Sequence, residues 1–313
     1  MSTSGTVSSR GSEDGSLSLA TSPLQALLEE GARKQICGGQ VLLRIRLACD
    51  EVASLREPMP LFSLQSRLAY LPLLFGAAYE HFKTSLPPRM GQSYEIWFDF
   101  NNVALRWHYP LGVLIDVLVG ADVPSPLDLT VHFRGCSSKE LLPFSGIGDL
   151  QRAVMNSFRQ AVFIQHGSSA PFAKLPKQQQ TRLWDAISAS NVEAYSEVLQ
   201  QLQCANLSRC RSLAVRLHLH GPPHMVLLHP VQPFANDGET AKLLSDFLLQ
   251  TLPVLLRESQ EQTSLADGVE VLAHGVRIPL DTPLWWLGLH AAYLDNFVHI
   301  AVRAPPQLLR HAS

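Results

Sequence analysis

Hydrophobic and polar residues follow one order of periodicities twice along the chain, and the first copy spans about residues 41–134. Between Val41 and Cys49, Leu and Ile alternate with Arg44 and Arg46, which is the period of a half-buried strand. The segment 71–86 instead places apolar residues four apart behind Pro72, which is typical of a helix that begins at a proline. A β-β-α-β-β-α-β order is completed by apolar runs at 60–65, 94–100, 103–107 and 127–134 and by a helix after Pro110.

The C-terminal third repeats this order. A helix over Thr240–Leu252 separates two pairs of strands, and Thr282 is predicted to cap a last helix with Pro283 in its first turn. The predicted strands are 213–219, 225–229, 269–275, 276–280 and 297–303. Because a helix follows each hairpin, two β-grasp, ubiquitin-like domains of the α+β class explain the duplication better than a β-sandwich. We expect Trp97, Trp107 and Phe133 to be mainly buried in the first domain, and Leu287, Phe297 and Ile300 in the second.

A helix-rich domain is predicted between the two repeats. One helix has Leu150, Val154, Phe158 and Ala161 on one face. A loop over 167–180 leads to a second helix, whose apolar stripe is Trp184, Ile187, Tyr195, Val198 and Leu202. The Ser-rich segment 1–22 is expected to be disordered, because it has almost no large apolar residues. The predicted domains are an N-terminal helix at 23–37, β-grasp domains at 38–135 and 211–304, the helix-rich domain at 136–210, and a tail at 305–313.

Composition narrows the class of protein. With 46% hydrophobic and 17% charged residues among 313, the chain can bury a full core. Its 25 Lys+Arg against 27 Asp+Glu show no basic field of the kind that nucleic-acid binders carry. The richest apolar run, 111–119, is interrupted by Asp116 and is too short to span a membrane. Five cysteines without CxxC spacing favour neither disulfides nor zinc, so we expect a cytoplasmic protein. The charge balance leads us to expect no nucleic-acid partner.

Histidines are the clearest candidates for chemistry. His218 and His220 alternate on a predicted strand and could bind a metal with His224 and His229, but an exposed histidine-rich hairpin is the favoured interpretation. His108 is interpreted as a strand-end histidine whose ring is satisfied by backbone groups.

Other signals for catalysis are weak. Cys210 lies between two arginines that could lower the pKa of its thiol. Trp285 and Trp286 could anchor a partner, although one ring is expected in the core. The sequence lacks GxSxG, HExxH, GxGxxG and P-loop motifs. We therefore expect no catalytic residue, metal or cofactor.

Several motifs resemble the autophagy protein 5 family, in the same order, over residues 35–303. A Trp-Phe hairpin at 97–98 is followed at 106–112 by Arg-Trp-His-Tyr-Pro-Leu-Gly, close to a signature of that family. Further matches are 66–71, 130–133, 183–184, 274–276, 282–287 and 295–300. The residues that carry the resemblance are Trp97, Trp107, His108, Tyr109, Pro110, Gly112, Trp184, His274, Gly275, Pro283, Leu284, Asn296, Phe297 and His299.

The resemblance implies two ubiquitin-like domains around a helical one and a non-catalytic scaffold. Family members are joined to the ubiquitin-like autophagy protein 12 and bind an N-terminal helix of autophagy protein 16. The complex acts like an E3 and promotes attachment of autophagy protein 8 to phosphatidylethanolamine. It is a peripheral membrane complex of the cytoplasm and the phagophore assembly site.

One position departs from the family pattern. The family's acceptor for the ubiquitin-like partner is a lysine on the first helix of the helical domain, in a pattern like Met-x-x-x-Lys-x-Ala. Here the segment is 155–161, and Arg159 stands at the lysine position, or Gln160 if the alignment moves by one. Neither side chain has the amine that an isopeptide bond needs, so the resemblance implies non-covalent partner binding in this chain.

Two alternatives to the scaffold remain. The first is a metal-dependent hydrolase that uses the histidine group around His218. The second is an adaptor that kept the fold and lost the pathway.

Overall fold

The computed structural model describes residues 31–309 except 89–95, 137–140, 203–210, 222–223 and 259–262. The Ser-rich segment 1–22, the helix start near Pro23 and the Gly-Pro-Pro turn after His220 therefore lie wholly or partly outside the described residues. The chain at 31–37 is helical.

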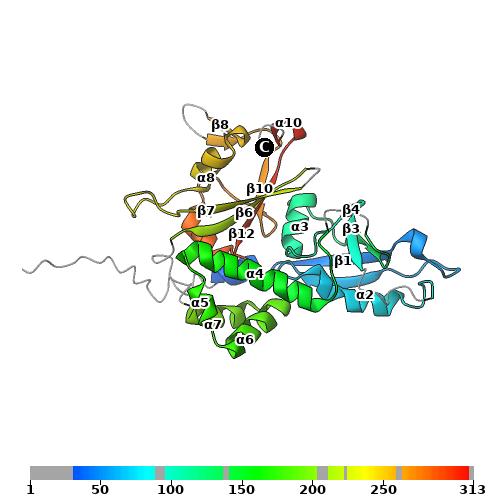
Figure 1. Ribbon diagram of the computed structural model, residues 1–313. Coiled ribbons are helices and arrows are strands. Elements are labelled where there is room, and N and C mark those ends of the chain that lie inside the picture. The colour runs from blue at the N-terminus through cyan, green and yellow to red at the C-terminus, as the bar shows by residue number, and fades with distance from the viewer. Residues whose placement is uncertain are drawn as a thin grey trace, which may run out of the picture.

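The first β-grasp domain forms one mixed sheet with helices on its inner face (Figure 1). The strand order is β2-β1-β5-β3-β4, in which β1 and β5 are parallel and the other neighbours antiparallel. The inner face of β1 buries Val41, Leu43, Ile45 and Leu47 against α2 and α3. Its elements are β1 (Gln40–Leu47), η1 (Cys49–Glu51), β2 (Leu61–Ser66), η2 (Leu71–Leu74), α2 (Phe75–Phe82), β3 (Trp97–Phe100), β4 (Val103–Ala104), α3 (Leu111–Leu118) and β5 (Leu127–His132).

The second β-grasp domain has the same topology. Its sheet order is β11-β10-β12-β6-β7, with β6 and β12 parallel, so each strand of the first sheet has a counterpart in the second. A hairpin of β8 and β9, which the sequence did not predict, follows its first helix. The elements are β6 (Leu213–Leu219), β7 (Met225–Val231), α8 (Leu244–Thr251), η4 (Pro253–Leu255), β8 (Leu256–Glu258), β9 (Thr263–Leu265), β10 (Glu270–Ala273), β11 (Val276–Arg277), α9 (Leu284–His290), β12 (Val298–Arg303) and α10 (Pro306–Leu309).

The helical domain differs from the prediction in two places. The expected loop 167–180 is mostly helical, because Pro171 starts a short helix and Pro176 caps the next. The expected second helix is two helices, because Ser190 has φ +53° and the Asn191 side chain caps a new helix by accepting the Ala194 N–H at 2.9 Å. The helices are α4 (Ile147–His166), α5 (Ala170–Ala173), α6 (Lys177–Ser188) and α7 (Val192–Gln201).

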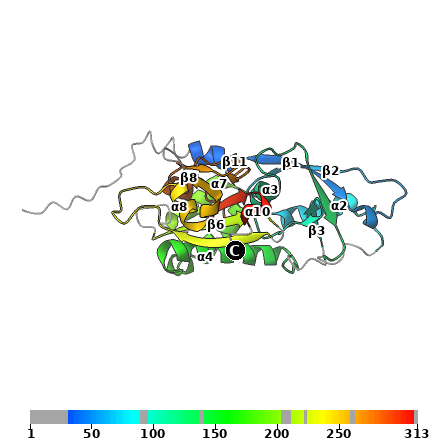
Figure 2. The same cartoon turned by 90° about the horizontal axis from the view of Figure 1, so that it is seen from above.

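The long helix α4 joins the domains. Figure 1 shows it running below the second sheet toward the first domain, with α5, α6 and α7 on its other side, and Figure 2 shows helix 31–37 on the opposite side of the molecule. Helices α3 and α4 contact β12 and β6 on the outer face, and α8 and α9 pack on the inner face, so the second sheet is covered on both faces. This explains why β6 is buried along its length except at Arg216.

The predicted core is correct except at one position. Trp107, Phe133, Leu287, Phe297 and Ile300 are buried. Trp97 is only half-buried, because it lies on the outer face of the first sheet, where its ring stacks on His132 with centroids 3.9 Å apart. Helix α9, for which Thr282 was the predicted cap, is capped by Pro283 instead, and no cap hydrogen bond comes from a side chain.

Candidate functional site at the junction of the three domains

Most of the residues singled out by sequence lie where α3, α4 and the second sheet meet. Pro110 precedes the first turn of α3, and its carbonyl accepts the Val113 N–H at 3.1 Å. Gly112 follows, and its N–H donates to the Arg67 carbonyl at 2.7 Å. A Cβ at Gly112 would lie 2.9 Å from that carbonyl oxygen and 3.0 Å from the Tyr293 hydroxyl. Glycine therefore allows the first helix turn to approach both domains.

A buried ion pair of the first β-grasp domain holds a backbone turn of the second. The Arg67 guanidinium donates to the Asp116 carboxylate and to the Gly112 carbonyl, the latter at 3.2 Å. The other carboxylate oxygen of Asp116 accepts the Gly275 N–H, from the β10–β11 turn, at 3.1 Å. Gly275 has φ +84°, and a Cβ there would lie 2.9 Å from the Arg67 guanidinium carbon. Burial raises the pKa of Asp116 to about 6, although Arg67 and the Gly275 N–H act in the opposite direction.

A chain of three imidazoles runs from the surface into this junction. His218 Nδ1 lies 3.3 Å from His224 Nε2, and His218 Nε2 lies 2.8 Å from His299 Nδ1. His299 Nε2 in turn lies 3.1 Å from both carboxylate oxygens of Asp295. An ionised carboxylate only accepts, so His299 donates to it from Nε2 and accepts from His218 at Nδ1. By the same logic His218 accepts from His224, and all three rings are assigned as neutral Nε2–H tautomers.

Asp295 is the acceptor at the inner end of the chain. Its carboxylate also accepts the Ser157 hydroxyl of α4 at 2.7 Å, Arg216 Nη1 of β6 at 3.2 Å and the Phe297 N–H at 3.2 Å. Burial alone raises the pKa of a carboxyl group, but His299, Arg216 and Ser157 lower that of Asp295 to about 2. Arg216 also donates to Gln160 Oε1 at 3.1 Å and lies 3.7 Å from the Phe297 ring centroid. One carboxylate thus connects the second sheet to α4.

The surrounding histidines are held neutral. Burial lowers the pKa of His108 and of His224 to about 4, and the cation of Arg106 adds to both shifts. Burial likewise lowers the pKa of His218 far below its usual value, with His299 and His224 as further causes. His274, stacked on Tyr293 at 3.9 Å, has a pKa lowered to about 4, again mainly by burial. The junction therefore favours uncharged imidazoles at neutral pH.

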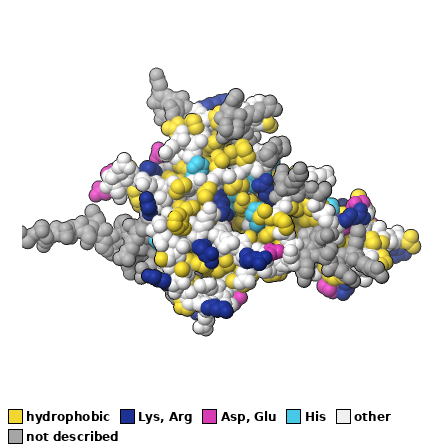
Figure 3. Space-filling model, in the orientation of Figure 1, with side chains coloured by type: hydrophobic (Ala, Val, Ile, Leu, Met, Phe, Trp, Pro, Cys, Tyr) yellow, Lys and Arg dark blue, Asp and Glu magenta, His cyan; other side chains and the backbone are white. Residues whose placement is uncertain are grey.

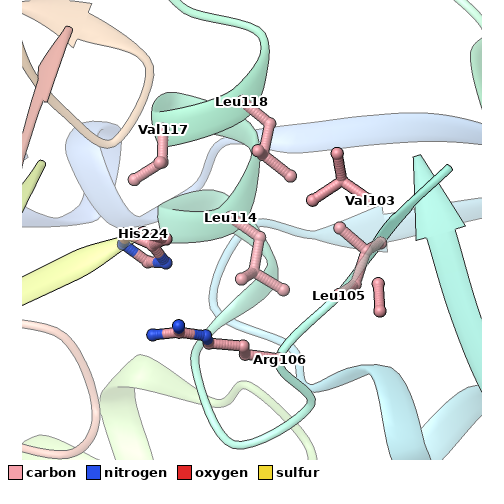
Figure 4. A pocket seen from close by; sticks show the side chains of 8 residues that line it. Val103, Leu105, Arg106, Leu114, Val117, Leu118 and His224 are labelled. Carbon is pink, nitrogen blue, oxygen red and sulfur yellow. The ribbon is translucent and has the colours of Figure 1, made fainter. Parts of the chain in front are cut away.

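A small apolar pocket opens beside the outer end of the imidazole chain. Figure 4 shows Leu114, Val117 and Leu118 of α3 facing Val103 and Leu105 of the β3–β4 hairpin and its continuation, with Arg106 and His224 on one side. In Figure 3 histidine side chains and side chains of the Lys and Arg class lie among apolar ones where α3, β6 and α4 meet. The pocket is therefore mostly apolar, with its basic groups on one wall.

The histidine predictions need correction. The hairpin histidines are not an exposed group, since His218 is fully buried, and His229 lies on the opposite face of the sheet beside Phe247. His108 lies in the turn before α3 rather than at a strand end, and within the described structure its Nδ1 has no hydrogen-bond partner. Cys210 lies outside the described residues.

The position that the resemblance implies as acceptor is on the surface of α4. Arg159 is exposed, with its guanidinium 5.1 Å from the Phe172 ring centroid, whereas the neighbouring Gln160 is bonded to Arg216. Trp184 is half-buried against the helical core, and Leu284 is buried with its N–H donating to the Lys242 carbonyl at 2.8 Å. Asn296, with φ +65°, donates from Nδ2 to Gln165 of α4 at 2.8 Å.

Sequence reasoning missed the charged residues of the junction, namely Arg67, Asp116, Arg216 and Asp295. Asp116 carried a usable signal, because a carboxylate inside an apolar helix must be paired if the helix is buried on all sides. The described residues contain no group of three or more His, Cys, Asp or Glu side chains arranged to hold a metal ion. No described helix is long and apolar enough to cross a membrane.

Three family models match the chain in succession. They are described as "Autophagy protein ATG5, UblA domain" over residues 36–133, "alpha-helical bundle region" over 148–204 and "UblB domain" over 212–302. These ranges contain both β-grasp sheets and almost all of the four helices of the middle domain.

Curated relatives and a solved structure agree with these matches. Autophagy protein 5 of Oryza sativa subsp. indica is 35% identical over 172 residues, which is 55% of this chain and 44% of that protein. Autophagy protein 5 of Aspergillus clavatus is 27% identical over 308 residues, covering 87% of this chain and 96% of that one. The crystal structure of Kluyveromyces marxianus Atg5 matches with a TM-score of 0.73 at 20% identity, over 87% of this chain and 99% of that chain, and so has the same fold.

Proposed function

Because the chain belongs to the autophagy protein 5 family and so has a role in autophagy, we propose that it is the non-catalytic scaffold of a ubiquitin-like conjugation system. In this proposal it forms an E3-like complex with autophagy proteins 12 and 16. The complex promotes attachment of autophagy protein 8 to phosphatidylethanolamine while bound peripherally at the phagophore assembly site. The chain itself supplies no catalytic residue, metal or cofactor.

The observation that carries the proposal is that several residues of the family signature lie at contacts between domains. Gly112, Gly275 and Asn296 hold domains to one another rather than lining an open site, and the His299 ring meets the Tyr109 ring of the first domain with centroids 6.2 Å apart. A scaffold needs such a fixed arrangement of domains, because partners bound to different domains must be held at a constant distance. The domain boundaries proposed are 38–135, 136–210 and 211–304.

We further propose that the ubiquitin-like partner binds without a covalent bond. An isopeptide requires a neutral amine as nucleophile, whereas the guanidinium of Arg159 stays protonated and delocalised. Arg159 is exposed on α4 and can meet a partner carboxylate, but such an exposed pair contributes only ~0–1 kcal/mol. Most of the affinity must then come from a wider interface. The competing idea is conjugation through Lys174 or Lys177, which are exposed, or Lys139, which lies outside the described residues.

Co-expression with the partner and its activating enzymes is expected to give two separate bands on a denaturing gel and one peak on a native column. Non-covalent assembly predicts this because dodecyl sulfate separates proteins that no isopeptide joins. The matched variants are Lys174→Arg and Lys177→Arg. A single fused band that disappears in one of them would contradict the proposal, and the absence of any native complex would favour the adaptor that lost the pathway.

The helical partner is proposed to bind beside helix 31–37, in a groove between the three domains. The observed part of that helix already connects domains: Arg33 donates to the Leu289 carbonyl at 3.1 Å, and Lys34 pairs with Glu193 of α7 at 3.1 Å. Its Cys37 thiol is buried beside His290. A helix held this way can form one wall of a groove for an amphipathic helix.

Deleting residues 1–34 is expected to weaken binding of the coiled-coil partner's N-terminal helix at least tenfold, because the deletion removes that wall. Isothermal titration with the purified partner helix measures it. Lys174→Ala, an exposed change on α5's C-terminal side, serves as the control and should leave the affinity unchanged. Equal affinity of the deleted and full chains would show that the groove is elsewhere.

A further inference from the structure

The two sheets can be superposed by register, because their strand orders are the same. Arg44 of β1 lies opposite Phe62 of β2 and Asp128 of β5. In the second sheet Arg216 of β6 lies opposite Leu228 of β7 and His299 of β12. Arg44 and Arg216 are therefore equivalent positions, and both lie on the outer face, away from the helices that complete each β-grasp fold.

In the second sheet this outer face holds a helix. Arg216 donates from Nη1 to Ser157 at 2.9 Å and from Nη2 to Gln160 at 3.1 Å, both on α4. Ala214, two residues before Arg216 on the same face of β6, packs against Ala161 of α4 and against Phe297. The molecule thus shows how an arginine and an apolar neighbour at these positions hold a helix against the sheet.

In the first sheet the same face is open among the described residues. Phe62 is 54% exposed and Leu64 is 59% exposed, and Leu42, the counterpart of Ala214, is half-buried between β2 and β5. Arg44 is turned sideways onto Asp128 of the neighbouring strand. Two adjacent aliphatic or aromatic side chains with more than half of their surface in water are unusual on a sheet that buries its other face.

The charge around this patch indicates what can cover it. Arg44 and Arg46 lie on the outer face of β1, and Asp128 is the one carboxylate that pairs with them in the described structure. The rim thus has one excess positive charge, and the Arg46 side chain is 52% exposed. A covering element should be apolar at its centre and acidic along one edge.

We propose that the outer face of the first sheet, formed by Leu42, Arg44, Arg46, Phe62 and Leu64, docks an amphipathic helix of a partner protein with an acidic edge. The pairing of β1 with β2 runs over six residues, which is ~20 Å of strand and matches ~13 residues of helix. This surface is formed by β1 and β2, and the inference does not depend on the proposed function. A partner helix bound there would pack on the first sheet as α4 packs on the second sheet within this chain.

The test uses a designed 18-residue amphipathic helix with a leucine stripe at i, i+3, i+4 and i+7 and glutamates along one edge. Fluorescence anisotropy with the full chain is expected to show saturable binding. Phe62→Asp is expected to weaken it at least tenfold, and Leu64→Asp likewise, because either puts a charge at the apolar centre. The same peptide with lysine in place of glutamate should bind wild type weakly and Arg46→Glu more tightly, since the change reverses the charge of the rim.

Leu249→Asp is the matched control, because Leu249 of α8 is also exposed, at 42%, but belongs to the other domain. This variant should bind the acidic peptide as wild type does. Absence of binding, or binding unchanged by both Phe62→Asp and Leu64→Asp, overturns the inference. Sedimentation that shows a dimer of this chain, which Phe62→Asp dissociates, would also overturn the inference. In that case a second copy of the chain, and not a partner helix, would cover this surface.

Discussion

Replacing Asp295 by alanine is expected to lower the free energy of unfolding by ~3–5 kcal/mol, the usual cost of removing one partner of a buried ion pair. The carboxylate is buried and accepts from Ser157, Arg216 and His299 at once. Without it Arg216 keeps a cation in a nearly dry site, and the imidazole chain loses its terminal acceptor. Urea unfolding followed by tryptophan fluorescence at pH 7 measures the change.

Asp128→Ala provides the matched comparison. Asp128 also binds an arginine in a bidentate pair, but its side chain is 50% exposed on the first sheet. An exposed pair of this kind contributes ~0–1 kcal/mol, so the comparison isolates burial from the ion pair itself. Similar losses in the two variants would contradict the role assigned to Asp295. A further check is hydrogen exchange in α4, which should speed up in Asp295→Ala, because Ser157 and Gln160 lie on that helix.

The sequence predicted the repeated fold because the relevant signals are local. The alternation of apolar and polar residues around Arg44 indicates a sheet with one solvent-exposed face, and prolines mark the starts of helices. The break at Ser190 carried only the weaker signal of an asparagine cap, which the apolar stripe on both sides obscured. The β8–β9 hairpin was missed because strands of three residues show no measurable alternation.

The junction was predictable only in part, because burial of a polar residue depends on what other domains place against it. In β6 and β12, His218 and His299 look like the outward residues of ordinary strands, and only α3 and α4 enclose them. Their partners lie far away in the sequence, as with Ser157 and Asp295. Arg159, which the resemblance places at the acceptor position, is exposed on α4.

Lowering the pH from 7 to 5 is expected to destabilise the chain by several kcal/mol at its domain junction. His108, His224 and His274 have pKa values of about 4 in the folded chain, against the ordinary 6.5 when unfolded. Between those values the unfolded chain binds more protons, so stability is present above pH 6.5 and falls as the pH drops toward 4. At pH 5 each such histidine costs up to ~2 kcal/mol.

Two groups oppose this loss without cancelling it. Asp116, with a pKa of about 6, takes up a proton in the folded chain before the unfolded one does, which returns ~1 kcal/mol at pH 5. His132 acts in the same sense, since Glu51 and Asp99 raise its pKa despite its burial. The imidazole chain adds to this loss of stability at low pH. A second proton on His218 would place its Nδ1–H against the Nε2–H of His224, so that two donors would face each other. We expect a net loss on the order of 4 kcal/mol.

His108→Phe is the variant that tests this pH dependence. Phenylalanine keeps a ring between Trp107 and Tyr109 and removes the titrating nitrogen, so stability at pH 7 should change little. The loss between pH 7 and pH 5 should shrink by ~2 kcal/mol, measured by urea unfolding at both values. His81→Gln is the control, because that side chain is exposed on α2, and its loss should equal that of wild type. An unchanged loss in His108→Phe would mean that the turn before α3 opens to water and solvates this imidazole before the domains separate.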